Sequence, residues 1–427
     1  MKKFTVAIVG LGGRGYHTYA KYQHRCPERM KIVAIADIDP EKVGLAGDEF
    51  GVPAEFRFDS AESLLSREKL ADVLIIATQD RQHRAHALKA LELGYDILLE
   101  KPVSVTARDC IEIRDAAKRT GRTVTICHVL QYTAFYRKIK EIIKSGAIGE
   151  PVSVGAIENV GYWHQAHSFV RGNWRNDEIE SPMILQKCCH DFDILSWLLD
   201  RRCISVSSYG SLKYFKAENA PEGSSARCVD CKYVKSCPYS AVKIYFDSEI
   251  GYRGGNRSWP LDILVEDPTE EKLLEAIRTG PYGRCVFRCD NNVVDHQIVN
   301  MQMEDDITVS LTMTAFTAKN CRQLKVMGTL GEIVADQGKN LVTVTPFGGE
   351  SVVYDIAKLT DDLSGHGGGD NRMMAEMFEA LEKGAGVSSS IEGAIASHLV
   401  AFAAEASRKR GGERILMRDF EAEERKK

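Results

Sequence analysis

A glycine-rich segment near the start of the chain is the first group of residues whose spacing could do chemistry. It comprises Gly10, Gly12, Gly13, Arg14 and Gly15. The segment directly follows the apolar run 4–9 and opens a helix. In that context the first glycine permits a tight turn, the second lets the backbone approach a pyrophosphate, and Gly15 allows close packing of helix on strand. The segment therefore predicts a dinucleotide site in which helix N-terminal amides face the phosphates.

An acidic residue at the end of the second expected strand indicates which dinucleotide binds. Asp37 lies 22 residues after Gly15. A carboxylate at this place accepts hydrogen bonds from both adenosine ribose hydroxyls and repels a 2′-phosphate. The sequence therefore predicts NAD in preference to NADP.

Cysteines at short spacing form a second group that could do chemistry. The three closest in sequence are Cys228, Cys231 and Cys237, all in a polar insertion. Three thiols so spaced predict a structural zinc site, which requires a fourth ligand. Candidates for that ligand are Cys285, Cys289 and His296. Free thiols in a reduced loop are the alternative, and an iron–sulfur cluster is disfavoured because the four-cysteine spacing of bacterial ferredoxins is absent.

The elements that must position these groups fall into two domains. Over residues 1–128, short apolar runs alternate with amphipathic segments, a pattern typical of a doubly wound parallel sheet, here a Rossmann NAD-binding domain. The expected strands are 4–9, 31–37, 73–77, 97–99 and 123–127.

The remaining residues, 129–427, favour an α+β domain with a mainly antiparallel sheet, because alternating stretches are joined by glycine-rich turns. This domain carries the cysteine-rich insertion around 215–295 and two C-terminal helices, 371–383 and 391–409. The charged tail 420–427 is expected to fray.

Leu99-Glu100-Lys101-Pro102, together with the glycine segment, resembles the Gfo/Idh/MocA oxidoreductases, named for glucose-fructose oxidoreductase and inositol dehydrogenase. Similar motifs continue at 144–149, 187–193 and 328–332 and in the helix from 371, so the resemblance spans nearly the whole chain. It implies a Rossmann domain followed by an open-faced sheet domain for substrate and oligomer contacts, and hence a homodimer or homotetramer. It also implies that Lys101 points into the active site. The residues expected to contact the cofactor are then Thr78, His83, Glu100 and Lys101.

Lys101 and His190 are the expected catalytic residues. Oxidation of a secondary alcohol needs a hydride acceptor, a base for the hydroxyl proton and donors for the developing alkoxide. Either residue could be the base, because a cationic nicotinamide should lower the pKa of the lysine and a histidine titrates near neutrality. The family's motif has an aspartate four residues before the histidine, where this chain has Gln186, which cannot accept a proton. Lys187 is expected either to bind substrate oxygen or to lie on the exposed side of its helix.

Substrate recognition is expected in a dense cluster of aromatic and polar residues. The cluster comprises Tyr162, Trp163, His164, His167, Arg171 and Trp174. Aromatic faces stack on the C–H face of a pyranose while His and Arg donate to hydroxyls or a carboxylate; a loop that merely packs on the sheet is the alternative. Further substrate candidates are His128 and Gln131 after the last Rossmann strand, and His366 in a flexible glycine loop whose Asp370 is expected to cap the next helix.

Bulk properties exclude several classes of function. The formal net charge is -4 with no basic patch, which argues against a nucleic-acid partner. The first apolar run is too short for a signal peptide or membrane span, so a cytoplasmic enzyme of small molecules is expected.

These features predict an NAD-dependent oxidoreductase that transfers a hydride from a secondary hydroxyl of a sugar, glycoside or cyclitol. The alternative is a redox-neutral glycoside hydrolase or lyase. In that case NAD stays bound, oxidises C3, acidifies the C2 proton for elimination and is then reduced back, as in some proteins that resemble this family.

Overall fold

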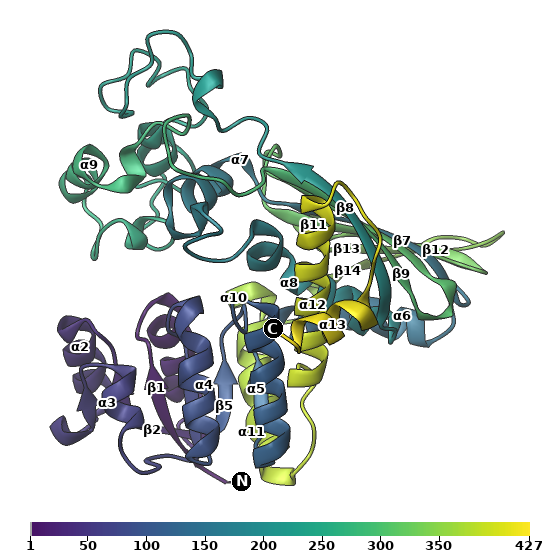
Figure 1. The fold of residues 1–427 in the computed structure, drawn as a ribbon, viewed down its shortest axis with the longest axis horizontal. Helices are drawn as coiled ribbons and strands as arrows, with labels where there is room; N and C mark the ends of the chain where they lie inside the picture. The colour runs from purple at the N-terminus through teal and green to yellow at the C-terminus, as the bar shows by residue number, and fades with distance from the viewer. Residues whose placement is uncertain (1) are drawn as a thin grey trace.

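Six parallel strands form the sheet of the N-terminal domain (Figure 1). In the computed structural model, which describes residues 2–427, their order is β3-β2-β1-β4-β5-β6. The strands are β1 (Phe4–Val9), β2 (Met30–Ala36), β3 (Arg57–Phe58), β4 (Val73–Ile76), β5 (Asp96–Leu99) and β6 (Val124–Ile126). Five were expected within a residue or two; β3 was missed because two residues carry no pattern.

Helices cover both faces of this sheet, as expected for a doubly wound fold. They are a π-helical segment (Gly13–Ala20), α1 (Tyr22–Arg25), α2 (Pro40–Phe50), α3 (Ala61–Leu65), α4 (His83–Glu92) and α5 (Ala107–Thr120). Side-chain caps define several helix starts: the Asp39 carboxylate accepts from the backbone of Glu41, and the Thr106 hydroxyl accepts from Asp109.

Nine strands form the sheet of the second domain, in the order β14-β13-β12-β11-β7-β10-β9-β8-β15. They are β7 (Pro151–Asn159), β8 (Cys203–Ser211), β9 (His296–Met303), β10 (Thr308–Thr314), β11 (Cys321–Gly328), β12 (Gly331–Asp336), β13 (Leu341–Pro346), β14 (Val352–Asp355) and β15 (Ile415–Leu416). All neighbours are antiparallel except β7 and β10, which run parallel. The expected fold class is confirmed.

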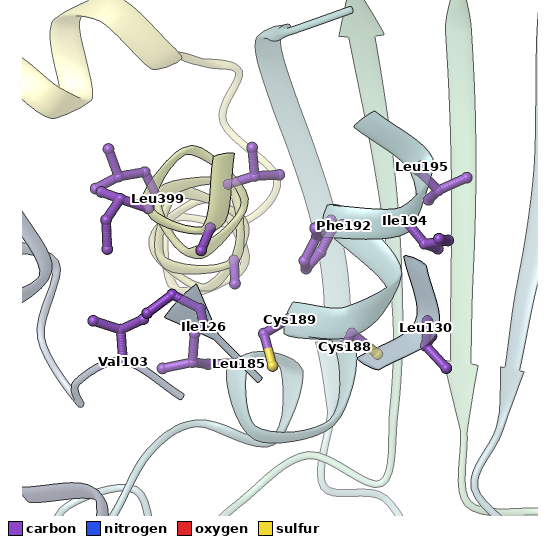
Figure 2. Packing of buried hydrophobic residues seen from close by; sticks show 14 of the residues in the cluster. Val103, Ile126, Leu130, Leu185, Cys188, Cys189, Phe192, Ile194, Leu195 and Leu399 are labelled. Carbon is purple, nitrogen blue, oxygen red and sulfur yellow. The ribbon is translucent and has the colours of Figure 1, made fainter. Parts of the chain in front are cut away.

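One face of this sheet is covered by α6 (Ala134–Lys144), α8 (Met183–Leu199) and α12 (Ile391–Lys409). Figure 2 shows this apolar core, where Phe192 of α8 faces α12, Leu195 lies on the side of the sheet, and Leu399 lies on the far side of α12 from Phe192. Cys188 and Cys189 are fully buried in the same core. Although α12 is the longest helix, neither it nor any other helix within residues 2–427 combines the length and apolarity needed to cross a bilayer.

The insertion between β8 and β9 has a small core of its own, built from apolar side chains of α7 (Tyr162–His164), α9 (Glu270–Thr279) and the loops around them (Figure 1). Tyr245, Leu273 and Ile277 are fully buried there. This core lies behind the aromatic segment 162–175, since Ala166 and Val170 belong to it.

The C-terminal elements return to the nucleotide domain. After the short turn α10 (Ser364–Gly367), α11 (Gly369–Lys383) inserts Met373, Met377 and Phe378 into the Rossmann core, where Phe378 stacks on Phe4 with ring centroids 5.4 Å apart. The domain division at residue 128 therefore does not coincide with the boundary of the hydrophobic core.

The tail is also ordered by packing. α13 (Met417–Glu424) buries Phe420, and its Glu421 pairs with Arg114 at 2.7 Å. The expectation that residues 420–427 fray is wrong for this helix, because a single apolar anchor and ion pairs to α5 hold it.

Candidate active site

The glycine loop after β1 has the geometry that a dinucleotide site needs. Gly10 has a φ of +88°, and a Cβ there would lie 2.4 Å from the carbonyl oxygen of Ala77. A Cβ on Gly15 would lie 1.8 Å from the carbonyl oxygen of Gly10. By contrast, a Cβ on Gly12 or Gly13 would meet nothing within 4 Å. The loop is thus closed on its sheet side and open where a pyrophosphate would approach.

Asp37 lies directly beside this loop. Its carboxylate accepts from the backbone N–H of Leu11 at 2.5 Å and of Asp39 at 2.9 Å, one bond to each oxygen. Each oxygen keeps a free lone pair for a ribose hydroxyl. The next residue, Ile38, is exposed and carries no charge that could pair with a 2′-phosphate.

Arg14 is held by acidic residues from two distant parts of the chain. Its guanidinium lies 2.5 Å from Glu100 Oε1 and 2.8 Å from Asp370 Oδ1. Asp370 also accepts a hydrogen bond from His366 Nδ1 at 3.0 Å. Burial would raise the pKa of the Asp370 carboxyl, but the bonds from His366 and Arg14 lower this pKa below its ordinary value. The sequence prediction that Asp370 caps α11 is therefore wrong. Gly368 stands at the capping position, and Asp370 instead joins α11 to the glycine loop.

Thr78 and His83 have different surroundings. Thr78 follows β4 and its hydroxyl contacts His86 Nδ1 at 3.1 Å. His83 is fully buried, with Nδ1 2.9 Å from the carbonyl of Pro102 and Nε2 3.0 Å from the carbonyl of Thr78. The expected cofactor contact of His83 is not supported, because both ring nitrogens are occupied; the ring instead holds the turn after β5 against the turn after β4.

Lys101 lies at the carboxyl edge of the Rossmann sheet, opposite α8. Its Nζ donates to the backbone carbonyl of Gln186 at 3.5 Å. The Gln186 amide, oriented to satisfy both of its ends, donates to Asp80 at 3.2 Å and accepts from Trp174 Nε1 at 2.8 Å. Burial raises the pKa of the Asp80 carboxyl, against the influence of His83 and Lys101. A carboxyl group thus lies beside Lys101 even though residue 186 is not an aspartate.

His190 is partly exposed on α8, and its Nδ1 is buried without a hydrogen-bond partner. Burial, with the positive charges of Lys101 and His128, lowers the pKa of His190 well below its ordinary value. The neutral imidazole is therefore the stable form, which leaves a nitrogen able to accept a proton.

His128 and Gln131 lie behind His190 and do not face a substrate. His128 Nδ1 pairs with Asp193 Oδ1 at 2.8 Å, and Gln131 donates to the other oxygen at 2.7 Å. Burial alone would lower the pKa of His128, but the neighbouring Asp193 carboxylate raises this pKa to about 10. Their expected substrate role is wrong, because both side chains are buried and bonded to Asp193.

A third histidine, His398 of α12, stacks on His128 with ring centroids 5.3 Å apart. Within residues 2–427, three potential metal ligands come within 4.8 Å of one another only at His128, Cys189 and His398. His398 donates from Nδ1 to the carbonyl of Ala394 and accepts at Nε2 from the backbone of Val103. Because both ring nitrogens are used, this trio does not form a metal site.

Lys187 belongs to a buried ionic network. Lys187 pairs with Glu158 at 3.2 Å. Arg322 also pairs with Glu158, at 2.9 Å, and with Asp191 at 2.8 Å. The sequence left open whether Lys187 binds substrate or faces solvent; its side chain instead links α8 to β7 of the sheet.

The aromatic segment divides into two groups. Tyr162, Trp163, His164 and Trp174 are partly exposed. Trp163 lies 5.2 Å from Trp259 of the insertion between ring centroids, and His164 Nδ1 contacts Asn320 at 3.2 Å. Burial and the charge of Lys187 lower the pKa of His164 well below its ordinary value, so this ring is neutral. These side chains retain the stacking and hydrogen-bonding capacity expected of a sugar site.

His167 and Arg171 point the other way, into the insertion. His167 is buried, bonds Tyr245 at 3.0 Å and stacks on Tyr282 with centroids 4.8 Å apart. Burial, with the neighbouring Arg171, lowers the pKa of His167 to about 3. Arg171 is fully buried and donates to the carbonyls of Arg284 and Tyr239. The expectation that these two residues bind substrate is wrong, because both side chains are buried and bonded to residues of the insertion.

The predicted cysteine ligands, Cys228, Cys231 and Cys237, lie together in the insertion. They line one cavity with Cys285, whereas Cys289 and His296 do not.

Three site residues were not found from the sequence: Asp80, Asp193 and Trp259. Asp80 follows β4 by four residues, and the preference of ligands for the carboxyl ends of parallel strands could have singled it out. Asp193 lies three residues after His190, within one helical turn. Trp259 carries no signal, because it reaches the aromatic segment only through the fold of the insertion.

A dinucleotide loop, a lysine at the sheet edge and a histidine from a second α/β domain define a two-domain NAD-binding oxidoreductase. The model of the oxidoreductase family with an NAD-binding Rossmann fold matches residues 4–128, and that of its C-terminal alpha/beta domain matches residues 140–415. The chain belongs to the Gfo/Idh/MocA oxidoreductase family.

Relatives within this family are distant. The protein YteT of Bacillus subtilis is 24% identical over 389 residues, covering 87% of this chain and 88% of the relative. Inositol 2-dehydrogenase 3 of Saccharopolyspora erythraea is 29% identical over 204 residues, 47% of this chain and 55% of that enzyme. An oxidoreductase from Agrobacterium radiobacter, solved with NAD+, L-tartaric acid and magnesium, has the same fold, with a TM-score of 0.68 at 16% identity over 98% of this chain and 99% of that one.

Proposed function

We propose that the protein is an NAD-dependent dehydrogenase that oxidises a secondary hydroxyl of a sugar, glycoside or cyclitol. The observation that carries this proposal is the placement of Lys101 between Asp80 and Gln186, with the neutral His190 on the adjacent helix. A cation and a proton acceptor at the carboxyl edge of a Rossmann sheet are what alcohol oxidation needs. The similarity to an inositol dehydrogenase supports a polyhydroxylated substrate.

In this proposal the chain's residues divide the work as follows. NAD, when bound, accepts the hydride from the carbinol carbon. Lys101 donates a hydrogen bond to the substrate oxygen and stabilises the charge that develops on it, while His190 takes the hydroxyl proton. Asp80 holds Lys101 in position through its charge and through Gln186.

NAD is the proposed cofactor in preference to NADP. The support is Asp37, whose two oxygens lie at the glycine loop, and the uncharged Ile38 that follows it. Gly12 and Gly13 would lie under the pyrophosphate, with Thr78 on the nicotinamide side.

The proposed substrate surface is the exposed part of the aromatic segment. Trp163, Trp259 and His164 form a continuous cluster, with His164 and Trp259 ring centroids 5.1 Å apart. His366, half-exposed in a loop with positive φ angles, would close the site from the side of α11.

The proposal extends to a homo-oligomer formed by the uncovered face of the nine-stranded sheet. Tyr209, Ile298 and Ile157 are exposed there, and the strand register places them in one row through Thr312. An apolar row on an open sheet favours burial against a second copy.

A cytoplasmic location is part of the same proposal. None of the twelve cysteines of the chain forms a disulfide, including the buried ones beside the active site. Unpaired cysteines in this number favour a reducing compartment.

The deciding experiment incubates the protein with NAD and a panel of free sugars, cyclitols and aryl glycosides. NADH absorbance and aglycone release are followed in the same wells. We expect NADH to accumulate in proportion to oxidised product. Aglycone release without net NADH would replace this proposal by the redox-neutral glycosidase, and turnover of no carbohydrate would refute both.

A further inference from the structure

Four cysteines in the insertion line one partly open cavity. The cavity is lined by the side chains of Cys228, Cys231, Cys237 and Cys285, together with Arg171. Its volume is about 30 Å³, on a scale on which one water needs about 10 to 15 Å³. The space therefore accommodates a group larger than a single water or metal ion.

The backbone explains why Cys285 joins the three clustered cysteines from a distance in sequence. Arg227 and Arg284 form an isolated antiparallel bridge. Next to it, Cys228 donates its N–H to Gly283 at 2.9 Å, and Cys285 donates to Ala226 at 2.8 Å. Because these bonds fix the two segments side by side, Cys285 is held as firmly beside Cys228 as a ligand in the same loop would be.

The charge balance of the cavity favours an anionic ligand. Arg171 is fully buried, its guanidinium bonds only carbonyl oxygens and Cys228 Sγ at 3.4 Å, and within residues 2–427 no carboxylate pairs with it. Its Nη1 has no hydrogen-bond partner. An uncompensated buried cation is costly, so a ligand that carries a net negative charge together with its coordinating sulfurs is expected in this cavity.

Other donors around the cavity are also unused. Arg227 Nε, Ser224 Oγ and Ser240 Oγ are buried without partners, and all three residues line the same space. Buried polar groups are nearly always paired in native proteins. Hydrogen bonds to the sulfur atoms of a metal cluster would satisfy them.

The separation of the thiols argues against a single tetrahedral zinc ion. A tetrahedral zinc ion with Zn–S bonds of about 2.3 Å holds its ligand sulfurs about 3.8 Å apart. Within residues 2–427, no three of these cysteine sulfurs all lie within 4.8 Å of one another. A cluster of four irons spreads its cysteine ligands over the corners of a cube and so requires wider spacing than one zinc ion.

We propose that the insertion holds a [4Fe–4S] cluster whose ligands are Cys228, Cys231, Cys237 and Cys285. This reverses the sequence expectation, in which zinc was predicted and an iron–sulfur cluster was disfavoured, both from spacing along the chain and not from separation in space. The cluster has a structural role: four thiolates around it carry the negative charge that Arg171 neutralises. Because Arg171 ends the segment that bears Trp163 and His164, the cluster fixes the insertion behind the proposed substrate surface.

The test uses the full chain, purified under nitrogen, with iron, acid-labile sulfide and zinc measured per chain. We expect about four irons and about four sulfides, with visible absorption that dithionite bleaches. One zinc without sulfide would overturn the proposal. So would the absence of any cluster after incubation with ferrous iron, sulfide and a thiol.

Matched variants test the ligand assignment. Cys285→Ser is expected to lower bound iron at least two-fold, whereas Cys289→Ser, four residues away and outside the cavity, should retain it in full. If Cys285→Ser does not fold, Cys231→Ser, which is partly exposed, replaces it. Equal iron content in a ligand variant and in Cys289→Ser would refute the assignment. NAD binding, measured alongside, separates this outcome from failure of the proposed dehydrogenase, which does not depend on the cluster.

Discussion

The glycine loop 10–15 and the aromatic segment 162–175 are the two densest groups of functional residue types in the chain, and the structure treats them differently. In the loop, Gly12 and Gly13 face open space while Gly10 and Gly15 are closed against the backbone. In the segment, Trp163 and His164 are partly exposed while His167 and Arg171 are buried in the insertion. In the loop, the local backbone geometry determines which glycines face the cofactor side. In the aromatic segment, only the tertiary packing determines which side chains are exposed and which are buried.

Lys101 provides the largest expected effect on the side of the Rossmann domain. Lys101→Ala should lower kcat by about 100- to 10,000-fold, because the alkoxide loses its donor and His190 its cationic neighbour. NAD affinity, measured by fluorescence titration, should change little. Lys118→Ala on the exposed side of α5 is the control and should behave as wild type. Normal turnover by Lys101→Ala would contradict the mechanism.

Arg171 tests whether the inner half of the aromatic segment is structural. Arg171→Ala should destabilise the protein by about 2 to 4 kcal/mol in urea unfolding, since two buried carbonyls lose their donor. Arg175→Ala, which breaks a more exposed pair with Asp290, should cost about 1 kcal/mol or less. If the stability of Arg171→Ala were unchanged and its KM raised, Arg171 would be a substrate-binding residue. The aromatic segment would then not be divided into an exposed and a structural half.

Asp37 tests the adenosine end of the loop. Asp37→Ala should weaken NAD binding by about 1 to 3 kcal/mol, the usual loss for hydrogen bonds to a charged group, and should narrow the preference over NADP. Isothermal titration with both cofactors measures this, with the nearby exposed Glu41→Ala as control. An unaltered cofactor preference would show that Asp37 serves only the backbone of Leu11 and Asp39.

The smallest expected effect concerns the histidines behind the active site. Asp193 raises the pKa of His128, so the charged pair contributes stability below neutral pH that is lost as the pH rises through about 10. Asp193→Asn should leave His128 neutral and relieve its repulsion of His190, whose pKa then rises. The acid limb of the kcat profile should move upward by about 0.5 to 1 pH unit. Asp109→Asn on α5 is the control, and an unmoved limb would exclude His190 as the titrating base.

Sequence reasoning succeeded where a residue's role follows from its own backbone. The glycine spacing, the strand ends at Asp37 and Lys101, and the helix 391–409 were all predicted, and the structure has them at or within a residue of the expected positions. Family resemblance correctly gave the two-domain architecture.

Roles that depend on which way a side chain points could not be predicted. His83 and His128 follow Rossmann strands as ligand-binding residues do, but each ring turns inward to a carbonyl or to Asp193. Asp80 and Gln186 meet only because α8 crosses the sheet edge. That Arg171 is buried without a carboxylate partner among residues 2–427 likewise follows only from the folded structure of the insertion.

The position of α11 has a consequence for biosynthesis. Met373, Met377 and Phe378 complete the core against which β1 and α1 pack, yet the ribosome makes them long after the six Rossmann strands. The nascent nucleotide domain must therefore wait with part of its apolar surface uncovered while the entire sheet domain is synthesised. Chaperones that bind emerging chains have their longest opportunity at that surface.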